Sequence, residues 1–237
     1  MNIFFTYLHQ RFNLWLFSTL TCYLLIFSKS NFHFDFNDIH HFFLLLFFLL
    51  VMRLYDDLKN TNNDKEKPDR IYTNITRAKE LSIRLYVLVT LLLAWLAYYN
   101  FLLALYTLVF FLFNHLLYYL LFNKHTFKHY LPLLKYPLIF IALSNHVNIT
   151  AVALFLAFLV FEIIEDKEFP ITKSYAWLLA TVASLLLFLE KPINHVWSYA
   201  LLFILIIIVL VTHSKYSPYF YLALFLLSRI IIQVDEI

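Results

Sequence analysis

The chain has 237 residues, of which 62% are hydrophobic, 20% aromatic and 14% charged, with a formal net charge of +3. Soluble domains are nearer half apolar and a quarter charged, so this composition excludes a water-soluble globular protein and intrinsic disorder. The single cysteine, Cys22, excludes a disulfide scaffold. The absence of glycine excludes a nucleotide-binding glycine loop, and no basic stripe typical of nucleic-acid binding is present.

The apolar residues fall into nine blocks of about the length that a bilayer requires. These blocks are 12–28, 40–57, 81–98, 101–121, 130–146, 148–164, 175–189, 195–212 and 217–233. Tyr98-Tyr99-Asn100 is typical of a short turn, and Pro132 and Pro137 should shorten or kink the fifth block. With no repeat or linker, residues 1–237 are expected to form one domain: an all-α polytopic membrane helical bundle with about nine transmembrane helices.

Basic residues are distributed unequally between the two membrane faces that nine spans create. One face receives the N-terminus and the loops after even-numbered spans, and it holds 15 of the 18 Lys and Arg residues: Arg11, Arg53, Lys59, Lys65, Lys67, Arg70, Arg77, Lys79, Arg84, Lys124, Lys128, Lys135, Lys167, Lys173 and Lys215. The positive-inside rule therefore places the N-terminus and residues 58–80 in the cytoplasm and the C-terminus outside.

The second block ends in a charged segment with a helical pattern. At 100° per residue, Arg53, Asp57, Asn60 and Asp64 fall within about 60° of one another, and Asp56 flanks this face. Oxygen ligands at this spacing suit Mg²⁺, which commonly bridges to substrate phosphates. The guanidinium of Arg53 can bind a phosphate with two hydrogen bonds. A solvated helix end is the alternative interpretation.

A second acidic group ends the sixth block. Glu162 and Asp166 are one helical turn apart, with Glu165 beside them. On the topology above, both acidic groups lie on the cytoplasmic side. If they hold metal ions that share one diphosphate, the two groups must lie within roughly 8–12 Å of each other. Taken alone, this second group is also consistent with a solvated helix end.

Nine spans with acidic segments after the second and sixth resemble the UbiA superfamily of intramembrane prenyltransferases. Residues 56–64, Asp-Asp-Leu-Lys-Asn-Thr-Asn-Asn-Asp, resemble its N-D-x-x-D-x-x-x-D motif, and residues 53–70 resemble the R-x-x-D-E-x-K-D-x-x-x-D form of one branch. The resemblance implies that Asp56, Asp57, Asn60, Asp64, Glu162 and Asp166 bind Mg²⁺. It also implies that Arg53, Lys124 and Lys128 contact the diphosphate of the substrate.

The resemblance implies Mg²⁺-dependent transfer of a prenyl group from an isoprenyl diphosphate to an aromatic or lipid-soluble acceptor within the membrane. Two alternatives stay open at this point. The same ionisation can lead to cyclisation of the isoprenoid, as in a UbiA-type terpene cyclase. The chain can also be a non-enzymatic membrane transporter or scaffold whose acidic helix ends are only solvated.

Overall fold

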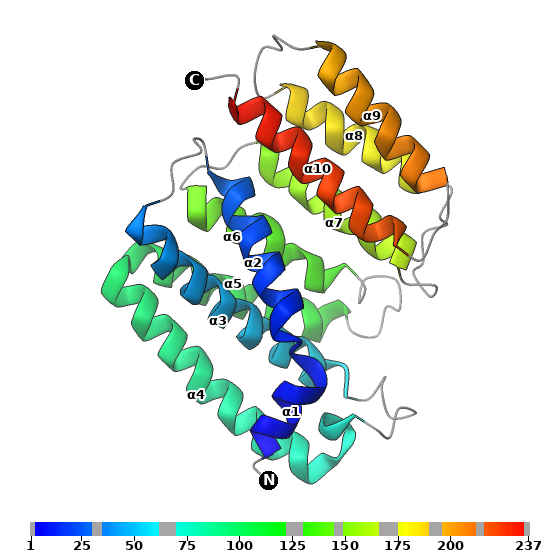
Figure 1. Ribbon diagram of the computed structural model, residues 1–237. Helices are drawn as coiled ribbons and strands as arrows, with labels where there is room; N and C mark the ends of the chain where they lie inside the picture. The colour runs from blue at the N-terminus through cyan, green and yellow to red at the C-terminus, as the bar shows by residue number, and fades with distance from the viewer. Residues whose placement is uncertain are drawn as a thin grey trace. The chain divides into compact units, whose positions relative to one another are not determined.

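The computed structural model describes residues 3–29, 35–61, 70–121, 130–144, 149–165, 175–189, 196–211 and 216–234. Within these ranges the chain is helical and has no strand (Figure 1). The all-α class expected from the composition is confirmed for this part of the chain.

Across the described ranges, nine helices coincide with the nine predicted apolar blocks. They are α2 (Leu14–Ser28), α3 (Phe36–Lys59), α4 (Ile75–Tyr99), α5 (Phe101–Leu121), α6 (Lys135–Ser144), α7 (Ile149–Glu165), α8 (Ala176–Leu189), α9 (Val196–Val211) and α10 (Ser217–Val234). The sequence did not predict the separate helix α1 (Ile3–Arg11) or the 3-10 turns η1 (Ile71–Thr73) and η3 (Leu131–Leu134).

Polar residues and prolines set the helix boundaries. The backbone N–H of Asn100 donates to Leu96 at the end of α4 (2.6 Å), and its side chain accepts from the N–H of Leu103 at the start of α5 (3.2 Å). One residue therefore caps two helices, which confirms the predicted turn. In the fifth block, Pro132 lies in η3 and α6 begins only at Lys135. The helix is thus shorter than the block, as expected, with Pro132 before its start and Pro137 accommodated in its first turn.

Three helices among the described residues, α3, α4 and α5, are long and apolar enough to cross a membrane. At a rise of 1.5 Å per residue, the 24 residues of α3 span about 36 Å, which exceeds the hydrocarbon core of about 30 Å. These helices expose large apolar side chains, including Ile83 (66%), Leu91 (55%) and Leu112 (63%). Contiguous apolar surface of this kind is unfavourable in water, so these features indicate a membrane protein.

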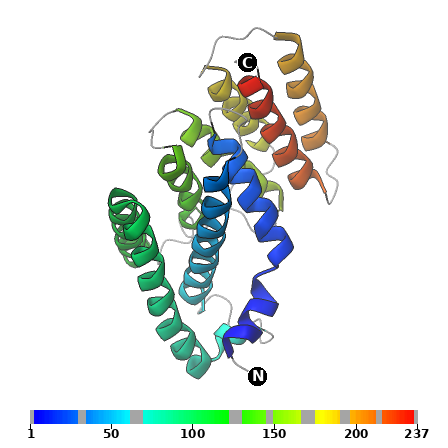
Figure 2. The same ribbon diagram turned by 60° about the vertical axis from the view of Figure 1, so that its left-hand side comes forward.

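The chain divides into two compact units, of which the first contains α1, the first part of α2, α3, η1, α4 and α5. Here α4 packs against both α3 and α5, and α1 packs against η1 and α4. Both views place α1 beside η1 at the N-terminal end of α4 (Figure 1 and Figure 2). The charged end of α3 belongs to this first unit.

The second unit contains the remainder of α2, η3 and α6 to α10. In it, α7 packs against α6, α8 and α10, and α9 packs against α8 and α10. The core includes stacked aromatic rings, with Tyr136 and Phe158 centred 3.6 Å apart and Phe27 and Phe225 centred 5.7 Å apart. The buried Arg229 lies over the ring of Phe27 and donates to the Phe27 carbonyl at 3.4 Å. Since Phe27 lies in the last turn of α2, Arg229 caps that helix.

Candidate functional site

The last two turns of α3 carry two adjacent buried carboxylates. Asp56 is 6% exposed and Asp57 is 5% exposed, although the helix otherwise consists mainly of apolar residues. A buried carboxylate requires a compensating charge or hydrogen bonds. The partners of each side chain therefore define what this end of α3 does.

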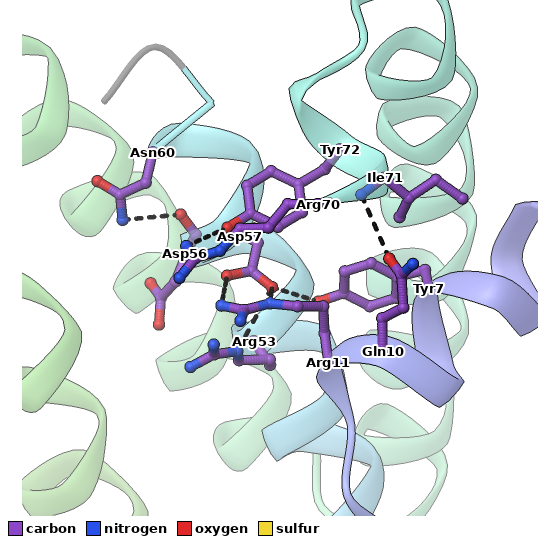
Figure 3. A network of polar contacts seen from close by, with 10 residues as sticks. All are labelled: Tyr7, Gln10, Arg11, Arg53, Asp56, Asp57, Asn60, Arg70, Ile71 and Tyr72. Carbon is purple, nitrogen blue, oxygen red and sulfur yellow. Dashed lines mark hydrogen bonds and ion pairs between the residues drawn. The ribbon is translucent and has the colours of Figure 1, made fainter. Parts of the chain in front are cut away.

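Asp57 is bound by groups from α1 and from its own helix (Figure 3). The guanidinium of Arg11 donates from Nη2 to Oδ1 (2.8 Å) and from Nε to Oδ2 (3.0 Å), which is the bidentate geometry typical of a strong pair. The hydroxyl of Tyr7 donates to Oδ2 at 3.0 Å. Arg53, one turn earlier on α3, lies 3.4 Å from Oδ2. Both carboxylate oxygens of Asp57 are thus engaged.

The contacts with Asp57 change the electrostatics of Tyr7 and Arg11 on α1. Burial and the neighbouring carboxylate raise the pKa of the Tyr7 hydroxyl above its usual range, so Tyr7 stays a hydrogen-bond donor. Burial opposes the charge on Arg11, but its hydrogen bonds to Asp57 and the carboxylate charge raise the pKa of Arg11 overall. The result is an ion pair that fixes α1 against α3.

A second set of contacts joins α1 to η1. The side-chain oxygen of Gln10 accepts from the N–H of Ile71 at 3.3 Å, and the guanidinium of Arg11 lies 5.5 Å from the centre of the Tyr72 ring. The side chain of Arg70 donates to the Tyr72 hydroxyl at 2.7 Å. These contacts hold η1 beside Asp57 (Figure 3).

Asp56 faces a different helix from Asp57. Its carboxylate points away from α1 in Figure 3 and accepts a long hydrogen bond of 3.4 Å from the hydroxyl of Tyr118 on α5. The side-chain nitrogen of Asn60 donates to the Asp56 backbone carbonyl at 3.0 Å. Nearby, Nζ of Lys59 lies 3.0 Å from Nδ1 of His115 on α5. Asp56 thus lies in a polar contact between α3 and α5.

The structure brings together part of the predicted site. Arg53, Asp56, Asp57 and Asn60 lie together at the end of α3. Glu162 lies in the last turn of α7, in the second unit, and is partly exposed. Four predicted residues lie outside the described ranges: Asp64, Lys124, Lys128 and Asp166. That the two acidic groups share one diphosphate stays a prediction.

The oxygen donors at the end of α3 are possible ligands of Mg²⁺, which prefers several oxygen ligands. In the described ranges, no group of three or more His, Cys, Asp or Glu side chains is close enough to share a metal ion. Arg11 and Tyr7 already donate to both oxygens of Asp57, which leaves fewer lone pairs for a metal ion. Asp56 and Asn60 place two side-chain oxygen donors at the end of α3, and Asp64, the third predicted ligand, lies outside the described ranges.

Sequence reasoning missed the partners of the two carboxylates. The sequence pattern identifies Arg11 as a basic residue before the first span, but it relates neither Arg11 nor Tyr7 to Asp57. The available signal was their spacing of four residues, which places both side chains on one face of a helix. Tyr118 carries no comparable signal, since nothing in the sequence relates it to Asp56.

The chain matches no family model, no curated protein and no solved structure. The fold and the site define the class of protein directly: an all-helical membrane protein, in the described ranges, with a buried charged cluster at the end of a membrane-length helix. Its function is therefore inferred from these residues.

Proposed function

We propose that this protein is an intramembrane prenyltransferase of the UbiA type with nine transmembrane helices. It transfers a prenyl group from an isoprenyl diphosphate to an aromatic or lipid-soluble acceptor. The observation that carries the proposal is the cluster at the end of α3, where two buried carboxylates, two arginines and an amide gather beside long apolar helices. Arginines and metal-binding carboxylates suit an anionic head group, and the apolar helices suit an apolar tail.

The layout of the chain supports the proposal. In the described ranges, a helix overlaps each of the nine apolar blocks and three of these helices are of membrane-spanning length; the segment that resembles the family motif ends one of the three. The excess of Lys and Arg on one face places this end of α3 and the N-terminus in the cytoplasm, with the C-terminus outside. Soluble isoprenyl diphosphates then reach the site from the cytoplasm.

The reaction breaks the bond between the first prenyl carbon and a diphosphate oxygen. A bond forms from that carbon to the acceptor, which loses a proton. When bound, Mg²⁺ would neutralise the departing diphosphate, and Asp56, Asn60 and Asp64 would hold the ion. As the resemblance implies, Glu162 and Asp166 would bind a further ion. Arg53, Lys124 and Lys128 donate to the diphosphate oxygens.

Asp57 has a separate part in this proposal. Its two oxygens bind Arg11, Tyr7 and Arg53 in the absence of substrate. A diphosphate offers Arg11 an alternative acceptor with the same bidentate geometry. In the proposal, Asp57 thereby positions Arg11 for the diphosphate.

The test uses the purified chain in lipid nanodiscs with radiolabelled geranylgeranyl diphosphate. Release of diphosphate is measured with and without Mg²⁺, and with and without a panel of phenols as acceptors. We expect Mg²⁺-dependent release that increases with an acceptor and yields a prenylated phenol. Release without an acceptor, together with a cyclic hydrocarbon product, would instead support the terpene cyclase.

Asp56→Asn should reduce diphosphate release by at least about 100-fold, since one charged ligand is lost. Glu80→Gln is the matched control, because Glu80 is a partly exposed carboxylate of α4 that pairs with Arg84 at 2.6 Å. No release from isoprenyl diphosphates of any chain length would overturn the proposal in favour of a non-enzymatic protein. Equal release by both variants would contradict the role of Asp56 as a metal ligand.

A further inference from the structure

The buried side chains of α5 form one stripe that includes a polar residue without a partner. The stripe is Ala104, Thr107, Phe110, Phe111, Asn114 and Tyr118, at a spacing typical of one helix face. Asn114 is 0% exposed, and neither its side-chain oxygen nor its nitrogen has a hydrogen-bond partner among the described residues. A buried amide in this state is unfavourable unless something else binds it.

Tyr55 of α3 presents a second buried group of this kind. Its side chain is 6% exposed, and its hydroxyl has no hydrogen-bond partner in the described part of the chain. The Tyr55 ring lies 6.1 Å from that of Phe111 and 5.7 Å from that of Tyr118. Since Asn114 lies between these two residues on α5, the Tyr55 ring lies at the level of Asn114.

The surroundings decide which ligand chemistry fits. The Asn114 amide both donates and accepts, and so does the Tyr55 hydroxyl. Tyr55 directly precedes Asp56, and the Tyr118 hydroxyl donates to the Asp56 carboxylate. A negatively charged ligand group is disfavoured beside this carboxylate. A neutral group that donates and accepts, such as a hydroxyl, satisfies both side chains.

We propose that Asn114 and Tyr55 form a subsite for the hydroxyl group of a lipid-soluble alcohol or phenol, held between α3 and α5. Tyr55 directly precedes Asp56, and Asn114 lies about one helical turn before Tyr118. The inference rests on the proposed function and deepens it, because it assigns the chemical class of the acceptor: a hydroxyl-bearing apolar molecule.

The test measures binding without catalysis, using three probes of similar size. 4-Hexylphenol donates and accepts a hydrogen bond, 4-hexylanisole only accepts one, and hexylbenzene does neither. Binding to the full chain in detergent is measured by calorimetry, with empty micelles subtracted. We expect the phenol to bind about tenfold more tightly than the anisole, and hexylbenzene to bind most weakly.

Asn114→Leu and Tyr55→Phe should each reduce the preference for the phenol by about 3- to 10-fold. Tyr106→Phe is the matched control, because Tyr106 is a tyrosine of the same helix that is 64% exposed, and it should leave the preference unchanged. Asn114→Leu should leave the melting temperature unchanged or raise it, because it removes a buried polar group without a partner.

Equal binding of the three probes would overturn the subsite, since water would then satisfy both groups. A lower melting temperature of Asn114→Leu would also overturn it, because Asn114 would then have a partner within the protein. These results are independent of catalysis. Phenol binding without any prenyl transfer would contradict the proposed function and leave the subsite in place.

Discussion

Arg11→Met should destabilise the protein by removing the main partner of a buried carboxylate. Methionine keeps the length and apolar packing of the arginine side chain and removes its charge and its hydrogen bonds to Asp57. The ion pair joins α1 to α3 across 46 residues of sequence. Its loss should therefore release α1 as well as lower the stability of the whole first unit.

The magnitude follows from the burial of the pair. The side chain of Asp57 is 7% exposed and that of Arg11 is 18% exposed. Removing one partner of a fully buried pair costs about 3–5 kcal/mol, because the other charge stays buried. Tyr7 and Arg53 continue to bind Asp57, and Arg11 is partly solvated, so about 2–4 kcal/mol is expected here.

The free energy of unfolding is measured by titration from dodecylmaltoside into sodium dodecyl sulfate. Arg84→Met is the matched control, because Arg84 pairs with Glu80 at 2.6 Å but both side chains are at least one third exposed. An exposed pair of this kind contributes less than about 1 kcal/mol. Arg11→Met and Asp57→Asn, combined in a double-mutant cycle, should show coupling of at least about 1 kcal/mol.

The reasoning is refuted if Arg11→Met costs no more than Arg84→Met, or if the effects of Arg11→Met and Asp57→Asn simply add. Hydrogen exchange gives an independent measurement. The backbone amides of α1 should exchange faster in Arg11→Met than in the wild type, while those of α7 in the second unit should not change.

Three further predictions concern the active site, the second unit and the topology. Asp57→Asn should reduce the activity of the folded protein less than about 10-fold, because Asp57 mainly binds α1, whereas Asp56→Asn should reduce it far more. Equal losses of activity in the two variants would make Asp57 a direct ligand. Arg229→Leu should lower the free energy of unfolding by about 1–3 kcal/mol, because the Phe27 carbonyl loses its donor, and unchanged stability would argue against a cap. Reporter fusions should place residues 58–80 in the cytoplasm and the C-terminus outside, and the reverse orientation would contradict the charge rule.

The sequence by itself determined the secondary structure of most of this protein. Apolar blocks long enough for a bilayer must satisfy their backbone groups internally, so they form helices. Asn100 ends one helix and begins the next because its backbone and side chain serve both ends. Pro132 lies in η3, before α6 begins at Lys135, for an equally local reason. In each case the information lies within a few residues of the boundary.

Only the tertiary structure decided the partners of the charged residues. The helical pattern placed Arg53 and Asp57 on one face, and their contact at 3.4 Å follows from that local geometry. By contrast, Asp56 and Asp57 are adjacent in sequence, yet Asp57 binds Arg11 of α1 and Asp56 contacts Tyr118 of α5. Which neighbour each carboxylate meets depends on how the helices pack, and packing combines residues far apart in the chain. A periodic pattern specifies the face of a helix, but it does not specify which helix lies against that face.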